Sequence, residues 1–255
     1  MFNLLAKDKI KEKCRNYFDV FLDILFPIEC LGCGREKFWL CPDCNNKINF
    51  NVLQMCSSCK KVNKFGITCE ECKTDTFLDG LLSAVSYEDK LVAKLIKTFK
   101  YSFVKDISKN LSGIFISFLQ NMIIDTKEAD LPQVLKNLNQ HIIMPVPLHI
   151  KRKRWRGFNQ SEELAKVISE YFNTQINLDS LIRTKNKSPQ AKLKGAERRM
   201  NVKGCFRVKN NDLVKDKIII LIDDVVTTAS TLDECAKVLK LAGAKEVWGW
   251  TVARG

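Results

Sequence analysis

The alternation of apolar and polar positions along the chain predicts strands that alternate with helices. The clearest strand is the apolar run 218–222, whose mostly β-branched residues are typical of a strand buried on both faces of a parallel sheet. A helical repeat follows, with apolar members Leu232, Cys235, Ala236 and Leu239 and with Gly243 placed to end the helix. This order favours an open α/β sheet, in which ligands bind at the carboxyl edge of the strands.

Weaker patterns of the same two kinds continue along the rest of the chain. Further strands are expected at 80–87, 142–144, 181–183, 205–208 and 246–253. Helices are expected at 91–103 and 107–124, followed by a connector with a short helix at 125–140. Another helix should begin near Asn159, because Glu162 stands in the position of a capping-box partner. These elements place one large domain at 77–255.

The N-terminal segment 1–26 predicts an amphipathic helix that ends before Pro27. Its apolar stripe consists of Phe18, Phe21, Leu22 and Leu25, with lysines upstream. Packing of this stripe on the next domain is the favoured interpretation, and binding to a membrane surface is the alternative. Residues 27–76 then form a separate module.

The module at 27–76 contains eight cysteines in four Cys-x-x-Cys pairs. Two residues between thiolates let both sulfurs face one tetrahedral ion, so four pairs supply two complete sites and about two Zn2+ ions are expected. The expected ligands are Cys30, Cys33, Cys41, Cys44, Cys56, Cys59, Cys69 and Cys72. Iron–sulfur clusters are the alternative, because sets of four cysteines also hold them. The spacing leaves open whether consecutive pairs share an ion or the pairs interleave.

Composition adds a location and a distribution of charge. With 255 residues, 28% charged and 45% apolar, the chain is typical of a soluble globular protein. No apolar run is long enough to span a bilayer, and acids interrupt the N-terminal apolar residues, so neither a transmembrane helix nor a signal peptide is expected. A cytoplasmic protein is therefore predicted. The net charge of +13 comes almost entirely from 151–156 and 185–203, which localises any binding of polyanions.

The strand at 218–222 leads into residues that suit a sugar phosphate. The loop after it offers a phosphate four hydroxyls and consecutive backbone N–H groups at a helix start. Its residues are Thr227, Thr228, Ala229, Ser230 and Thr231. Asp223 and Asp224 would repel a phosphate, so they are expected to accept hydrogen bonds from vicinal ribose hydroxyls or to hold Mg2+. A P-loop is excluded because the chain has no GxxxxGK, and a turn with accidental acids is the structural alternative.

Two basic segments complete the predicted site. The loop 151–156 places five cations beside a helix start, which suits a pyrophosphate that Arg152 and Arg156 can bind bidentately. A patch for nucleic acid is the alternative, and Trp155 is the nearest aromatic that could stack a base. The span 185–203 is interrupted by Pro and Gly and predicts a long excursion of the kind that serves as an active-site lid.

The segment IDDVVTTAST resembles the signature of type I phosphoribosyltransferases, and it departs from that signature at Ala229, where the family commonly has Gly. With PVPLH, RGFNQ, PQAKL and ERRMNV upstream, the chain is similar to the ComF family of competence proteins over nearly its whole length after Phe26. The resemblance implies a type I phosphoribosyltransferase-like parallel sheet flanked by helices, with an N-terminal four-cysteine zinc-ribbon module. It also implies a site for phosphoribosyl pyrophosphate and a role in natural transformation.

Two functions remain after this resemblance. In the favoured one, a cytoplasmic protein at the DNA-uptake machinery binds phosphoribosyl pyrophosphate with Mg2+ and holds single-stranded DNA, with DNA-uptake or recombination proteins as partners. In the other, an active phosphoribosyltransferase, amidophosphoribosyltransferase-like or for base salvage, transfers the phosphoribosyl group to an unidentified acceptor. The first is favoured because no side chain outside the shared signature offers an evident acceptor pocket. A complete amidophosphoribosyltransferase is not expected, because the chain lacks a glutaminase half with an N-terminal cysteine nucleophile.

Overall fold

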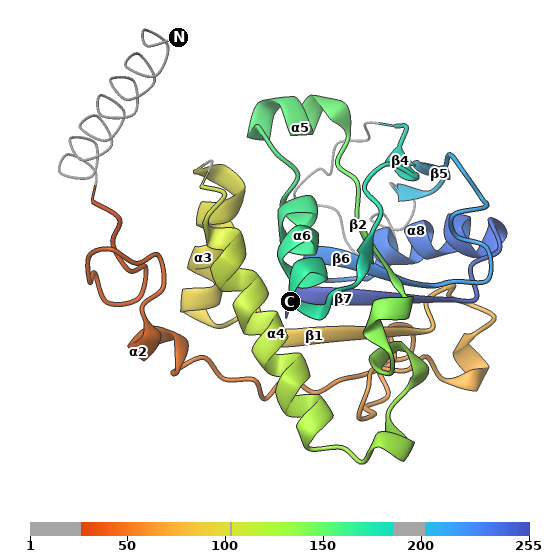
Figure 1. Cartoon of the computed structure of the whole chain (residues 1–255), viewed down its shortest axis with the longest axis horizontal. Helices are drawn as coiled ribbons and strands as arrows, with labels where there is room; N and C mark the ends of the chain where they lie inside the picture. The colour runs from red at the N-terminus through yellow and green to blue at the C-terminus, as the bar shows by residue number, and fades with distance from the viewer. Residues whose placement is uncertain (1–26, 103, 186–201) are drawn as a thin grey trace, which may run out of the picture. The chain divides into compact units, whose positions relative to one another are not determined.

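The computed structural model describes residues 27–102, 104–185 and 202–255 (Figure 1). The chain divides into two compact units between Lys47 and Ile48. The predicted N-terminal helix and all but the ends of the predicted lid lie outside the described residues. Within the described ranges, no helix is long and apolar enough to cross a bilayer.

The first unit has little regular structure in its described part, 27–47. It contains an isolated antiparallel bridge between Glu29 and Glu36 and the short helix α2 (Pro42–Asn45). In this part of the chain, Leu40 is the one buried apolar side chain apart from cysteines. So small an apolar core cannot by itself stabilise a fold, and another source of stability is required.

The second unit is built on a five-stranded sheet in the order β1-β7-β6-β2-β3, with every neighbouring pair parallel. Its strands are β1 (Gly80–Ser86), β2 (Ile142–Pro145), β3 (Gln175–Ile176), β6 (Ile218–Val226) and β7 (Glu246–Arg254). A separate antiparallel pair consists of β4 (Leu181–Arg183) and β5 (Phe206–Val208). The predicted fold class is confirmed, although β6 continues through the acidic pair to Val226.

Helices cover both faces of this sheet (Figure 1). They are α3 (Lys90–Tyr101), α4 (Ile107–Ile124), α6 (Gln160–Phe172) and α8 (Ser230–Leu241). The ring of Trp250 in β7 lies 5.4 Å from Phe115 of α4 and 6.4 Å from Phe172 of α6. Side chains alternate along a strand, so Val247 points to the other face, where it packs in one cluster with Leu232 of α8. The connector between α4 and β2 contains three 3-10 turns, η2 (Glu128–Asp130), η3 (Gln133–Leu135) and η4 (Leu138–Gln140).

The basic segment after β2 forms a helix, so the prediction of a loop at 151–156 is wrong. The helix is α5 (Ile150–Arg156), and it ends at Gly157 with a φ of +74°. His149 caps its start, because Nδ1 accepts a hydrogen bond from the Lys151 N–H at 3.3 Å. Cations occupy its last turn, where the negative end of the helix dipole favours them.

The predicted capping box at the start of α6 is also wrong. The Asn159 side chain caps no N–H of the helix and instead donates to the Val146 carbonyl at 3.1 Å. Glu162 forms ion pairs with Lys153 of α5 and Lys166 of α6. Charge pairing with the neighbouring helix α5, which the sequence did not predict, therefore replaces the capping interaction.

The segment 51–79 lies along the outer edge of β1 and contains η1 (Glu70–Cys72). The Gln54 amide imitates a neighbouring strand: its Nε2 donates to the Ser83 carbonyl at 2.9 Å, and its Oε1 accepts from the Ser83 N–H at 3.1 Å. The Leu81 N–H donates to the Gly66 carbonyl at 3.0 Å. The edge strand β1 therefore has hydrogen-bond partners on both sides.

Candidate functional site

Each set of four cysteines converges on one point. The Sγ atoms within each set lie within 4.8 Å of one another. The first cluster is Cys30, Cys33, Cys41 and Cys44, and the second cluster is Cys56, Cys59, Cys69 and Cys72. Consecutive pairs therefore share a site, which decides between the two arrangements that the spacing allowed. The Sγ atoms of Cys33 and Cys41 are 3.6 Å apart, and those of Cys59 and Cys69 are 3.7 Å apart. Both distances are close to the separation of about 3.8 Å around a tetrahedral Zn2+ with bonds of about 2.3 Å.

The thiols of the first cluster cannot all ionise without a cation between them. Burial disfavours the Cys30 thiolate and would raise its pKa. Hydrogen bonds from backbone N–H groups, of which that of Cys41 contributes most, have the larger effect and lower the pKa of Cys30 to about 6. Burial and the adjacent thiols raise the pKa of Cys44 to about 12. A divalent ion that binds all four sulfurs removes this conflict, because it favours the thiolate form of each.

The acidic pair at the carboxyl end of β6 has two different environments. Asp224 is 5% exposed, and its Oδ1 lies 2.8 Å from Nζ of Lys100 in α3. Asp223 Oδ1 accepts hydrogen bonds from Ser161 Oγ and from the Asp224 N–H, both at 2.9 Å. Burial and the charge of Asp224 raise the pKa of Asp223 to about 7. At neutral pH the carboxyl group of Asp223 therefore exchanges its proton beside the ion pair of Asp224 and Lys100.

The loop between β6 and α8 has the geometry of an anion site. Helix α8 begins at Ser230, so its first N–H groups are not used within the helix. Ala229 adopts a φ of +57°, the left-handed region that costs a non-glycine residue about 1–2 kcal/mol. The hydroxyls of Thr228 and Ser230 are 2.9 Å apart. The loop and Asp223 enclose a hollow of about 50 Å³, which suits a phosphate group.

Two of the five cations in α5 are half-buried, and the other three are exposed. Arg152 and Arg156 are four residues apart and lie on one side of the helix. Burial and the charges of Arg183 and Arg156 lower the pKa of Arg152. Within the described ranges, none of these three arginines forms an ion pair with a carboxylate. Their mutual repulsion creates a site that a bound anion would stabilise.

The sequence identified the acids and the loop but missed three residues beside them: Lys100, Ser161 and Arg183. On the same helix α3, Lys94 and Lys97 are exposed, whereas Lys100 is half-buried. Lys100 follows buried Ile96 by four residues, so it shares the inward face of the helix. That spacing is the signal that could have found it.

Two domain families match the chain. A double zinc ribbon domain matches residues 21–73, and a phosphoribosyl transferase domain matches residues 131–254. The first range contains all eight clustered cysteines, and the second contains α5, the acidic pair and the loop 227–231. The two clusters are therefore zinc-binding sites, on a chain whose sheet belongs to a phosphoribosyltransferase-like domain.

Several relatives are similar over most of the chain. Competence protein F of Haemophilus influenzae is 28% identical over 230 residues, which are 88% of this chain and 90% of the relative. Competence protein ComFC of Bacillus subtilis is 27% identical over 223 residues, 84% of each chain. DNA utilization protein YhgH of Escherichia coli (strain K12) is 36% identical over 112 residues, 44% of this chain and 48% of that protein.

Solved structures give a weaker likeness. A hypoxanthine phosphoribosyl transferase of Trypanosoma cruzi aligns with 56% of this chain and 64% of its own, with a TM-score of 0.33 and 11% identity.

Proposed function

The chain belongs to the ComF family, and from that premise we propose that it acts in DNA uptake during natural transformation and binds phosphoribosyl pyrophosphate with Mg2+. Single-stranded DNA is its second ligand. In this proposal the protein acts in the cytoplasm at the DNA-uptake machinery, with DNA-uptake or recombination proteins as partners. The names of its relatives, for competence and DNA utilization, support the cellular role.

The order of charges at the carboxyl edge of the sheet carries the ligand proposal. In space, the acidic pair lies next to the anion-binding loop 227–231. Lys100 comes next, because it pairs with Asp224. Positive charge continues beyond Lys100. The charge of Arg156 is close enough to act against protonation of both Lys100 and Arg152, as its effect on the pKa of each shows. A phosphate site, an acidic site and a cationic site in this order match the 5-phosphate, the ribose hydroxyls and the pyrophosphate of one molecule.

The acidic pair also fits Mg2+ by its chemistry, because carboxylate oxygens are the ligands this ion prefers. Lys100 already neutralises much of the charge of Asp224, so Asp223 is the residue expected to hold the ion. When bound, Mg2+ would neutralise the charge of the pyrophosphate. Arg152 and Arg156 would orient that group from the other side.

Calorimetry with phosphoribosyl pyrophosphate and Mg2+ tests this assignment. Asp224→Ala should weaken binding by about 1.5–3 kcal/mol, the range for losing a hydrogen bond to a charged group, because it removes the carboxylate that holds Lys100 at the site. The matched control is Asp212→Ala, an exposed aspartate of the same unit, which should leave the affinity unchanged. Absence of binding to the unsubstituted protein at millimolar ligand would reject the site.

The raised pKa of Asp223 predicts a pH dependence of this binding. Below its pKa of about 7 the Asp223 carboxyl is protonated and is a poor ligand for Mg2+, so affinity should rise as pH increases from 6 to 8 through that value. The phosphates of the ligand also titrate, so the measured quantity is the difference between the protein and its Asp223→Asn variant. Equal pH profiles for the two proteins would contradict this role of Asp223.

The outer side of α5 is the proposed surface for DNA. Trp155 is 61% exposed, so it does not pack inward and its ring is available to stack a base. Lys151 and Arg154 are exposed beside it, whereas Lys153 is paired with Glu162. The other predicted cations, at 192–199, lie outside the described residues.

Fluorescence anisotropy with a labelled oligonucleotide tests this surface. With about four to six phosphate contacts, log affinity should fall with log salt at a slope of about −3 to −4. Trp155→Ala should cost about 1–3 kcal/mol, and Tyr171→Ala, an exposed aromatic on α6, should cost nothing. A flat salt response would exclude DNA as the ligand of this surface.

One observation favours a transferase as the second candidate. A partly exposed carboxylate with a pKa of about 7, as Asp223 has, can take a proton from an acceptor amine or base at neutral pH. Release of pyrophosphate from phosphoribosyl pyrophosphate, assayed with and without a panel of amines and nucleobases, distinguishes this function. Release that depends on the acceptor and is lost in Asp223→Asn would establish transfer.

A further inference from the structure

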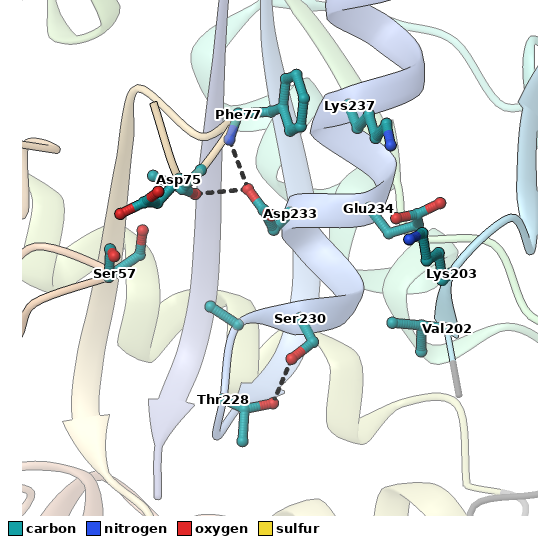
Figure 2. A pocket seen from close by; sticks show the side chains of 13 residues that line it. Ser57, Asp75, Phe77, Val202, Lys203, Thr228, Ser230, Asp233, Glu234 and Lys237 are labelled. Atoms are coloured by element: carbon teal, nitrogen blue, oxygen red, sulfur yellow. Dashed lines mark hydrogen bonds between the residues drawn. The ribbon is translucent and has the colours of Figure 1, made fainter. Parts of the chain in front are cut away.

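A larger pocket adjoins the anion-binding loop on the side away from the acidic pair. It has a volume of about 490 Å³, within the range of small-molecule sites. Thr228, Ala229 and Ser230 line both this pocket and the small hollow, but Asp223 lines only the hollow. Figure 2 shows Thr228 and Ser230 at one end of the pocket and Phe77 with Lys237 at the other.

The position of this pocket excludes it as the acceptor site of a transferase. This step rests on the proposed function, in which the loop holds a 5-phosphate and the acids hold the sugar. An acceptor must reach C1 of that sugar, on the side of the acids and arginines. The pocket lies beyond the phosphate instead, so an occupant that is part of the same ligand would be joined to the phosphate through a second ester bond. A phosphodiester has this connectivity, and the monoester of phosphoribosyl pyrophosphate does not.

The walls of the pocket suit an uncharged nucleoside. Phe77 is 40% exposed and offers a ring for stacking, with Lys237 Nζ 5.6 Å from its centroid. The pocket runs along α8 from Ser230 to Lys237, about 10 Å of helix at 1.5 Å per residue, which is the length of a nucleoside. Ser57 also lines the pocket, but it is only 8% exposed and its Oγ is buried, so the stacking ring of Phe77 is the main contact expected for a base.

The charges around the pocket argue against a second phosphate there. Three carboxylates line it, those of Asp75, Asp233 and Glu234, against the ammonium groups of Lys203 and Lys237. Asp233 accepts from the Phe77 N–H at 2.7 Å, and Glu234 accepts from the Gly204 N–H at 2.6 Å. Asp75 is exposed and can accept from the N–H of a base.

The acidic pair defines which nucleotide of a strand can occupy the loop. A nucleotide within a strand carries a second phosphate on its 3′ oxygen, and Asp223 and Asp224 would repel it. A terminal 3′ hydroxyl can instead donate to a carboxylate. Because Asp224 is buried and paired with Lys100, Asp223 is the accessible acceptor, and one hydroxyl is sufficient.

From these observations we propose that the site binds the 3′-hydroxyl end of single-stranded DNA. The last phosphodiester lies on the loop 227–231, the terminal sugar faces Asp223, and the preceding nucleoside stacks on Phe77 in the larger pocket. Phosphoribosyl pyrophosphate and the DNA end then compete for one phosphate site.

Calorimetry with four small ligands tests the proposal: thymidine 5′-phosphate, the dinucleotide TpT, its 3′-phosphorylated form TpTp, and the ribodinucleotide UpU. TpT should bind about tenfold more tightly than thymidine 5′-phosphate, as expected for one stacked base. TpTp should bind at least about tenfold more weakly than TpT, because its 3′ phosphate faces the acids. Equal affinities of TpT and the mononucleotide, or of TpT and TpTp, would overturn the proposal. Tighter binding of UpU than TpT would identify an RNA end instead and would overturn the assignment to DNA.

Substitution of Phe77 separates stacking from a structural effect. Phe77→Ala should lower the affinity for TpT to that for the mononucleotide, which itself should be unchanged, and Phe77→Trp should restore TpT binding with quenched fluorescence. The matched control is Phe38→Ala, which removes a ring of nearly equal exposure, 41%, in the first unit. If Phe77→Ala weakens the binding of TpT and of the mononucleotide equally, Phe77 has a structural role and the proposal is contradicted.

Binding of phosphoribosyl pyrophosphate is measured in parallel. If it binds and TpT does not, only the proposal for the nucleoside pocket fails. If neither ligand binds, the assignment of the loop as a phosphate site fails too.

Discussion

The two cysteine clusters have the same ligands and nearly the same geometry but different surroundings. The first cluster lies in a unit whose described part buries one apolar side chain other than cysteine. The second cluster belongs to the unit that contains the sheet. Gln54 and Gly66 connect its segment to β1, and Thr76 donates to Asp233 in the first turn of α8 at 2.5 Å. Zinc in the first cluster therefore stabilises its own unit, whereas zinc in the second also supports the sheet and the anion-binding loop.

Loss of a ligand from each cluster should give the largest contrast. Cys44 and Cys72 are both buried, so Cys44→Ser and Cys72→Ser are matched. A structural zinc contributes about 10–16 kcal/mol of apparent free energy. Each change should therefore unfold the segment around its own cysteine cluster. Only Cys72→Ser should lower the melting temperature of the sheet, measured by circular dichroism with zinc content as a check that each variant loses one ion. Equal shifts of that temperature would contradict the comparison.

Two glycines provide the next contrast. Gly66 and Gly34 both have positive φ, +62° and +78°. A Cβ on Gly66 would lie 2.2 Å from the Leu81 carbonyl oxygen, whereas one on Gly34 would have nothing within 4 Å. Gly66→Ala should therefore cost about 3 kcal/mol or more, from strain and displacement of the ribbon from β1, and Gly34→Ala about 1 kcal/mol from backbone strain alone. Chemical denaturation measures both.

Removal of the Gln54 amide should have a smaller effect. Gln54→Ala leaves both backbone groups of Ser83 unpaired on a buried edge, at a cost of about 1–3 kcal/mol in the free energy of unfolding. Gln120→Ala, which removes an exposed amide bonded to Tyr171, should cost much less. If both variants unfold at the same denaturant concentration, the pairing of Gln54 with β1 contributes nothing.

The smallest effect concerns ligand binding. Thr76→Val removes the hydroxyl that donates to Asp233 but keeps the shape of the side chain, so the start of α8 should be less well held. The affinity for phosphoribosyl pyrophosphate should fall by about 1 kcal/mol or less. Thr74→Val, at an exposed hydroxyl of the same segment, is the control. An unchanged affinity in Thr76→Val would show that the second cluster does not support the loop.

The strands and long helices could be predicted because each buries a continuous apolar stripe of its own sequence. Helix α4 occupies the predicted range, and β7 and β2 differ from the prediction by one residue. The convergence of the four thiols in each set follows from local spacing in the same way. Local patterns therefore define the elements and the metal sites well.

The contacts that complete the candidate site could not be predicted, because they join residues far apart in the chain. Lys100 reaches Asp224 and Ser161 reaches Asp223 only through the packing of α3 and α6 on the sheet. The helix α5 was missed because its repeat consists of cations and carries no apolar stripe. Arg152 and Arg156 were identified from the sequence, but their half-buried position on one side of a helix becomes evident only in the structure.

The segment 51–79, which covers the outer edge of β1, affects how the protein behaves without zinc. An uncovered edge strand presents unpaired N–H and C=O groups to other chains, and natural sheets protect such edges. The opposite edge strand, β3, is only two residues long and offers little surface for pairing. Zinc-depleted protein is therefore expected to self-associate through β1, so zinc in the second cluster serves solubility as well as stability.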